Sequence, residues 1–287
     1  MSRFPLFWIN LNSQIIRKKR MEYALREGGW INNYRFDAID GSDPKNKFIP
    51  LEKFWHKGTS FPGAFIYDED IPNRITNRGE LACLCSWQML VESLENYDSS
   101  CGWFLLMEDD VGSSLATVHN WPVCLNEIIE NVPEDALAIQ MAPINGNLRS
   151  KLHHEWKESR GRTLVVPKNC VKSHGNGAVL LNQSAIPFLK RRLGRIIEKI
   201  LTNFHFLTHP YKIRPVADKW LYASLPENTC WVSTFPLFCL EAETSSLHQK
   251  HINTYHLASR EATLQIWREE NYTELIEAYR QWKSICY

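Results

Sequence analysis

This sequence lacks three features, and each absence excludes a class of protein. It has no excess of charge, because 33 Lys and Arg residues face 32 Asp and Glu residues, which leaves a formal net charge of +1. Without a basic excess that displaces counterions, binding to nucleic acid through electrostatics alone is not expected. No apolar run approaches the ~20 residues that cross a bilayer. Repeats and low-complexity tracts are also missing, which excludes the collagen-like, coiled-coil and disordered classes.

Cysteine pairs with the spacing of a metal or redox site are missing as well. The eight cysteines include no C-x-x-C pair, which is the spacing that zinc and redox sites use. We interpret them as reduced, mostly buried thiols. The apolar stretch before Asn10 is too short and too aromatic for a signal peptide. These features predict a cytoplasmic protein.

What the sequence does contain is the patterning of an α/β protein. Leu6–Asn10 is a short apolar run that predicts a buried strand, and residues 13–27 follow as a helix that ends at Gly28 and Gly29. Residues 34–39 predict a second strand. A strand, a helix and a strand at this spacing indicate a βαβ unit and a parallel sheet.

The rest of the chain continues the same alternation. Further strands are predicted at 103–107, 136–141, 163–166, 176–181 and around 232–240, with helices after residue 77, from Ser184 and over 261–286. Residues 42–75 show no period and are rich in Pro, Gly and aromatic residues, which favours an irregular folded excursion near a ligand. We predict one domain over residues 1–287, of α/β class with a central, mostly parallel sheet.

The most informative stretch is the run of three acids Glu108, Asp109 and Asp110, directly after the apolar run 103–107. Adjacent carboxylates repel one another, and a divalent cation offsets that repulsion. Hard ions such as Mg²⁺ or Mn²⁺ favour carboxylate oxygens. In open α/β sheets, ligands bind at the carboxyl ends of strands, where these acids lie. The alternative is a solvated acidic turn.

The order of several short motifs carries a family resemblance. In chain order they are Ile9-Asn10-Leu11 with basic residues at 17–20, Ala38-Ile39-Asp40-Gly41, Gly79-Glu80 with Cys85-Ser86, Glu108-Asp109-Asp110-Val111, Gly175-Asn176-Gly177-Ala178 and Pro215-Val216-Ala217-Asp218. This order resembles the family 25 glycosyltransferases, which include lipooligosaccharide and collagen galactosyltransferases, over about residues 6 to 245. The resemblance implies a GT-A (Rossmann-like) fold that binds a nucleotide sugar, a divalent metal and inversion at the anomeric carbon.

The resemblance also implies which residues bind the metal. Glu108 and Asp110 match the first and third positions of the D-x-D motif, with Asp109 between them in the donor site. They would hold Mn²⁺ or Mg²⁺ against a departing nucleoside diphosphate. His248 is a candidate for a late histidine ligand. A surface histidine is the alternative reading of His248.

Six residues are assigned to the nucleotide-sugar donor by the same resemblance: Asn10, Leu11, Asp40, Glu80, Gly175 and Gly177. Asn10 and Leu11 would lie under the nucleotide at the end of the first strand. Asp40 would lie beside the base or ribose, unless it belongs to a plain Asp-Gly turn. Gly175 and Gly177 would let the backbone approach the sugar closely, although an ordinary turn into a strand explains them as well.

Inversion by direct displacement needs a base that takes the proton of the acceptor hydroxyl. Asp218 resembles the Pro-x-Asp site of the family, although the spacing here is Pro-Val-Ala-Asp. Its alternative role is to cap a helix that begins at Lys219. Glu241 and Glu243, after the strand expected around 232–240, are the other candidates.

The function implied is a metal-dependent inverting transferase that moves a hexose, galactose or glucose, from a UDP-sugar to a glycan acceptor such as lipopolysaccharide or capsule. Trp87 departs from the family, which usually has histidine there, and motivates a non-catalytic nucleotide-sugar-binding module as an alternative. Another alternative keeps the chemistry but makes the acceptor a protein hydroxyl or a modified DNA base.

A basic cluster lies in the helix expected after Ser184, at Lys190, Arg191, Arg192, Arg195 and Lys199. A solvated helix face explains it most simply. Alternatively it meets an anionic acceptor, such as a membrane surface, a phosphorylated glycan or nucleic acid. We therefore expect a nucleotide-sugar donor and a glycan acceptor as partners, peripheral membrane contact as an option, and nucleic acid as a lesser one.

Overall fold

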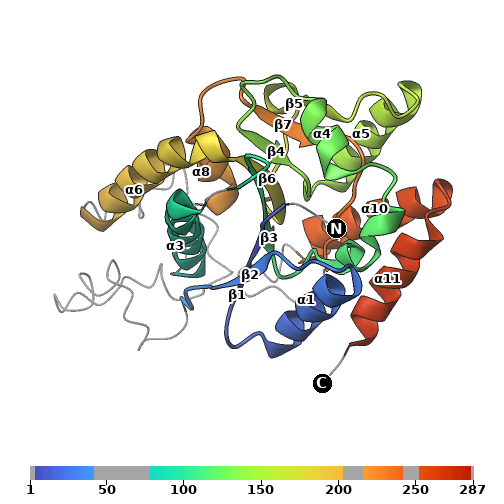
Figure 1. Cartoon of the computed structure of the whole chain (residues 1–287), viewed down its shortest axis with the longest axis horizontal. Coiled ribbons are helices and arrows are strands. Elements are labelled where there is room, and N and C mark those ends of the chain that lie inside the picture. Colours follow the sequence, from blue (N-terminus) through green and yellow to red (C-terminus); the bar gives the residue numbers. More distant parts are fainter. Residues whose placement is uncertain (1–3, 42–77, 98, 203–215, 242–251, 286–287) are drawn as a thin grey trace. The chain divides into compact units, whose positions relative to one another are not determined.

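This computed structural model describes residues 4–41, 78–97, 99–202, 216–241 and 252–285, and it contains a seven-stranded sheet (Figure 1). Its strands are β1 (Leu6–Asn10), β2 (Asn33–Asp37), β3 (Trp103–Glu108), β4 (Ala138–Gln140), β5 (Val165–Pro167), β6 (Ala178–Asn182) and β7 (Cys230–Ser233). They lie in the order β2-β1-β3-β6-β4-β7-β5. The predicted α/β class is confirmed.

The sheet is mixed, with most strands pointing one way. β1 pairs with β3 and β4 with β7 in parallel, whereas β6 is antiparallel to both β3 and β4. It follows that β1, β3, β4 and β7 share one direction, as a mostly parallel sheet requires, while β5 runs against β7. Ile9 pairs with Glu108. This register brings the carboxyl ends of β1 and β3 together at one edge.

The chain divides into two compact units. The first comprises Met1–Phe36, Asp98–Ala185 and Pro226–Tyr287, and the second Asp37–Tyr97 and Ile186–Leu225. The prediction of a single domain over 1–287 stays a prediction. The excursion expected at 42–75 lies outside the described residues.

The helical elements of the first unit are α1 (Ile15–Glu27), η3 (Ser113–Asn120), α4 (Leu125–Glu130), α5 (Gly146–Glu158), η4 (Lys168–Cys170), η5 (Gln183–Ala185), η6 (Ile252–His256), α10 (Leu257–Glu269) and α11 (Thr273–Ser284). Helix α1 ends as its glycines predict: the Gly28 N–H donates to the Ala24 carbonyl, and Gly29 has a left-handed φ of 67°. Helices α1 and α11 lie side by side (Figure 1).

One face of the sheet packs against these helices to form the hydrophobic core of the first unit. Trp8 of β1 and Leu105 of β3 belong to the same buried cluster as Met21 of α1 and Trp282 of α11. The alternation of side chains along each strand selects this face. Helix α1 is thereby fixed above the edge where β1 and β3 end.

The helical elements of the second unit, in its described part, are α3 (Arg78–Ser93), η2 (Leu94–Asn96), α6 (Ile186–Thr202) and α8 (Ala217–Ala223). Helix α3 packs against α6 and α8. The apolar residues Leu84 and Val91 of α3 are buried, and Trp87 between them has 1% of its surface exposed. Trp87 is a core residue of this helix.

Three local predictions were wrong. The strand expected around 232–240 ends at Ser233, and residues 234–240 continue as buried irregular chain. Pro236 has no backbone N–H for the hydrogen bonds between strands, so the apolar character of the run was not enough to predict a strand. Helix α8 begins at Ala217 with Val216 as its N-cap, which leaves Asp218 in the first turn. Of the seven free cysteines in the described part, Cys85 and Cys239 are buried, so the thiols are not mostly buried.

Within the part of the chain that the structure describes, no helix combines the length and the apolar character needed to cross a membrane.

Candidate functional site

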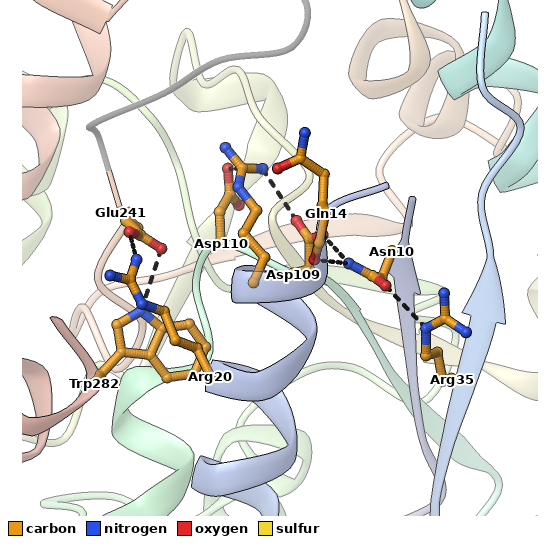
Figure 2. Close-up of polar contacts among 9 residues, drawn as sticks. Asn10, Gln14, Arg20, Arg35, Asp109, Asp110, Glu241 and Trp282 are labelled. Carbon is orange, nitrogen blue, oxygen red and sulfur yellow. Dashed lines mark hydrogen bonds and ion pairs between the residues drawn. The ribbon is translucent and has the colours of Figure 1, made fainter. Parts of the chain in front are cut away.

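The acidic run lies at the carboxyl end of β3, beside the end of β1, as the sequence predicted. Figure 2 shows the contact that joins the two ends: the Asn10 side-chain amide donates to the Asp109 carboxylate, with 2.6 Å between Nδ2 and Oδ2. Asn10 itself is 1% exposed. Its carbonyl oxygen Oδ1 accepts a hydrogen bond of 2.9 Å from Arg35 of β2. Asn10 therefore links three neighbouring strand segments.

Asp109 is held from two sides. Besides Asn10, Arg17 of α1 donates to its other oxygen, with 3.1 Å between Nη1 and Oδ1. Burial raises the pKa of Asp109, and the charge of Arg17 opposes that rise. Both carboxylate oxygens are occupied by protein donors. In this geometry Asp109 fixes the end of β1 and the start of α1 against β3.

Asp110 is held far less. Its Oδ2 lies 3.7 Å from Nη1 of Arg17, and within the described structure its Oδ1 is buried without a hydrogen-bond partner. Burial raises the pKa of Asp110, again against the charge of Arg17. A buried carboxylate oxygen without a donor is costly. It is therefore the atom of the acidic run that calls for a ligand.

The unpartnered Oδ1 of Asp110 indicates whether the residues at this place could bind a divalent cation. Hard cations bind carboxylate oxygens, and Asp110 Oδ1 is a carboxylate oxygen that no protein donor occupies. Glu108 is half-buried two residues earlier, and its N–H donates 2.8 Å to the Gly177 carbonyl. No group of three or more His, Cys, Asp or Glu side chains assembles around a metal position in the described residues. His248 and Glu243 lie outside that part of the chain.

The turn into β6 lies beside the acidic run, and its two glycines leave no room for a side chain. Gly175 has a φ of 95°, and a Cβ there would lie 2.7 Å from Cγ2 of Ile144. A Cβ at Gly177 would lie 2.8 Å from Cγ1 of Val111. Close contact within the protein already explains both glycines. Their predicted approach to a donor sugar stays a prediction.

Gln140 and Lys168 fix the same turn, and neither residue was selected from the sequence. Nε2 of the fully buried Gln140 donates 2.9 Å to the His174 carbonyl and also donates to the Gly175 carbonyl. Lys168 Nζ donates 2.7 Å to Gln140 Oε1 and 3.1 Å to the Ser173 carbonyl. A glutamine inside the apolar run 136–141 was the available signal.

Glu241 contacts the acidic run through its backbone, whereas its side chain contacts other residues. Its N–H donates 2.6 Å to the carbonyl of Asp110. Its carboxylate forms an ion pair with Arg20 of α1 and accepts a 3.3 Å hydrogen bond from the Trp282 indole (Figure 2). The proposed role of Glu241 as a base stays a prediction, and both of its oxygens already have donors.

Arg20 was also missed by the sequence analysis. It lies four residues from Ile16 and from Ala24, on the apolar stripe of α1, and it is 6% exposed. A charged residue at an apolar position of a helix is a signal for a buried ion pair.

The remaining candidates belong to other places. Leu11 is half-buried, and its carbonyl accepts from the Gln14 N–H in the turn into α1. Three candidates belong to the second unit: Asp40, Glu80 and Asp218. There the Ile39 N–H, next to Asp40, donates 2.9 Å to Ser86 Oγ, which joins two motifs of the resemblance. Glu80 is 1% exposed in the first turn of α3.

No family model matches the chain, and no curated protein sequence matches it. Among solved structures, the chain is similar to the apo form of mouse xyloside xylosyltransferase 1, with a TM-score of 0.35 and 9% identity over 80% of this chain and 84% of that one. A likeness of this size defines neither family nor activity.

Proposed function

We propose that this protein is a metal-dependent inverting glycosyltransferase that transfers a hexose, galactose or glucose, from a UDP-sugar to a glycan hydroxyl. The observation that carries the proposal is the buried, unpartnered Oδ1 of Asp110 at the shared carboxyl edge of β1 and β3. Ligands of α/β sheets bind at that edge. The resemblance to family 25 glycosyltransferases supports the same assignment of Asp110.

Asp110 would hold Mn²⁺ or Mg²⁺ with Glu108, and the cation would supply positive charge to the departing diphosphate. The protein's own residues prepare that place. Asn10 and Arg17 occupy Asp109, which leaves Asp110 as the acid with an available oxygen. Arg17 adds a positive charge at the same edge.

The family resemblance makes Asp218 the first candidate for the base, with Glu241 and Glu243 as the other candidates. The Glu241 carboxylate already accepts from Arg20 and Trp282, whereas a base must be able to take a proton from the acceptor. Asp218 is half-buried in the first turn of α8. For the acceptor, the exposed cations Arg191, Arg192 and Arg195 of α6 favour an anionic glycan or a lipid-linked one.

The test is release of UDP from UDP-galactose and UDP-glucose by the full chain, with Mn²⁺ and with chelator. Turnover should require the cation, and Asp110→Asn should reduce it by about 10²–10³-fold, because one ligand of the charge-stabilising ion is lost. Asp135→Asn is the matched control, since Asp135 is an exposed acid of the same unit, and it should retain full turnover.

Turnover that persists unchanged in chelator, or in Asp110→Asn, contradicts the proposal. Binding of UDP by calorimetry with no transfer to any glycan would indicate the non-catalytic module instead. Transfer to a hydroxymethylated DNA duplex or to a protein hydroxyl would keep the chemistry and replace the acceptor.

A further inference from the structure

A buried ion pair connects helix α1 to the chain beside the acidic run. Arg20 and Glu241 are 6% and 5% exposed, and Nη1 of Arg20 pairs with Oε1 of Glu241. The Trp282 indole donates 3.3 Å to the other oxygen of Glu241. Lys283 Nζ lies 3.8 Å from Oε1. The Glu241 carboxylate therefore receives hydrogen bonds from two helices that are distant in the sequence, one from Arg20 of α1 and one from Trp282 of α11.

The same arginine also holds the end of α11. Its Nε donates 3.1 Å to the Ile285 carbonyl, and its Nη2 donates 3.1 Å to the Lys283 carbonyl. The last carbonyls of a helix have no partner within the helix, so a cation there satisfies them. Arg20 thus uses its whole guanidinium fork in fixed directions. Lysine cannot reproduce this geometry.

The backbone of Glu241 carries the connection to the candidate metal ligand. Its N–H donates 2.6 Å to the carbonyl of Asp110, at the point where β3 has ended. Asp110 lies beyond the strand ladder, so this bond supports its peptide where strand pairing no longer does.

We propose that Arg20 is a positioning residue: through Glu241 it fixes the backbone at Asp110 and so sets the direction of the unpartnered carboxylate. This inference rests on the proposed function for its purpose, since a cation needs its ligand held in place. A buried ion pair is weak evidence for stability by itself. Its connection to Asp110 gives the pair a role beyond stability.

Hydrogen exchange of the full chain tests the link without any ligand. In Arg20→Met and in Glu241→Gln, the Glu241 amide should exchange at least about tenfold faster than in the wild type, because local opening becomes easier. Peptides that contain residues 109–112 should also gain exchange. Arg20→Lys keeps the charge without the fork and serves if Arg20→Met does not fold.

Thr263→Val is the matched control. Thr263 accepts 2.7 Å from Arg149, another buried arginine of the first unit, so the variant removes a comparable polar contact elsewhere. Its Glu241 amide should exchange at the wild-type rate. An unchanged rate in both Arg20→Met and Glu241→Gln, or in Arg20→Lys and Glu241→Gln where Arg20→Met does not fold, overturns the proposal.

Mn²⁺ titration followed by electron paramagnetic resonance provides the second readout and separates the two hypotheses. Arg20→Lys should bind Mn²⁺ at least about tenfold more weakly than Thr263→Val of equal melting temperature, because the ligand is less well oriented. Equal affinity in the two variants overturns the positioning role. A wild type that binds no Mn²⁺ contradicts the proposed function instead, and amide exchange then decides alone whether Arg20 fixes Asp110.

Discussion

The amide of Asn10 donates to the carboxylate of Asp109 over 2.6 Å, and this bond joins two strand ends that are 99 residues apart. The two neighbouring acids, Asp109 and Asp110, therefore differ in their contacts. Asp109 is consumed by protein contacts to Asn10 and Arg17. Asp110 keeps a buried oxygen without a partner. Substitution by Asn should therefore mainly reduce stability at Asp109 and mainly reduce turnover at Asp110.

Asp109→Asn should lower the free energy of unfolding by about 1–3 kcal/mol. It weakens the buried contact to Arg17, and the new amide NH2 group faces a donor, either Asn10 or Arg17. Asp110→Asn should change that free energy by no more than about 1 kcal/mol, because it removes a buried charge whose Oδ1 lacks a donor. Urea unfolding measures both. Turnover of a UDP-sugar should fall most in Asp110→Asn. If Asp110→Asn is the more destabilised and the more active of the two, this division of roles is wrong.

The strands and the place of the acids could be predicted because both depend on local patterns. The apolar run 103–107 became β3 and the run before Asn10 became β1, so three acids after a buried strand had to lie at the sheet edge. The pairing of Arg20 with Glu241 could not be predicted, since no local pattern connects residues 221 positions apart. The run after Ser233 was equally apolar, and its burial did not depend on strand pairing.

Gly175→Ala should destabilise the protein by more than Gly29→Ala. Both glycines have left-handed φ values, 95° and 67°, so both substitutions incur backbone strain of about 1 kcal/mol. A Cβ at Gly175 also meets Ile144 Cγ2 at 2.7 Å, whereas one at Gly29 meets nothing within 4 Å. Overpacking of this kind costs a further ~1–3 kcal/mol. Thermal and urea unfolding of the two variants measure the difference.

The Gly29→Ala variant is itself the control, because it isolates the strain of the backbone from the clash. Equal loss of stability in the two variants would mean that Ile144 moves aside without cost. In that case the contact with Ile144 does not fix the turn into β6, and the hydrogen bonds of Gln140 and Lys168 gain in importance.

Gln140→Met should destabilise the protein by about 1–3 kcal/mol, because it removes a buried amide that donates to two carbonyls of this turn and accepts from Lys168. The carbonyls concerned are those of His174 and Gly175, to which Gln140 Nε2 donates. Methionine has a similar volume, so no large cavity confuses the measurement. The control is Gln281→Met, since Gln281 is an exposed residue of α11 with hydrogen bonds to Tyr23 and Glu277. Equal stabilities of the two variants in urea would contradict the role of Gln140.

His153 should make the protein less stable in mild acid. Burial lowers its pKa, against the charge of Glu270, whose Oε1 lies 3.1 Å from Nε2. Lys157, 3.2 Å from Glu270, favours the neutral imidazole, whereas the charge of Glu269 opposes it. Tyr272 also lies near Glu270. The unfolded chain then binds the proton more readily, so stability is present above an unfolded pKa of about 6.5 and is lost as the pH falls below it.

Urea unfolding at pH 7.5 and at pH 5.5 measures this loss, which should be smaller in His153→Gln than in the wild type. Glutamine keeps a polar side chain between Trp156 and Phe235, the rings that flank His153, but it takes up no proton. His154→Gln, on the exposed side of α5, should keep the wild-type dependence on pH. An identical loss of stability in His153→Gln and in the wild type would show that other groups, and not this buried imidazole, bind the protons that unfold the chain.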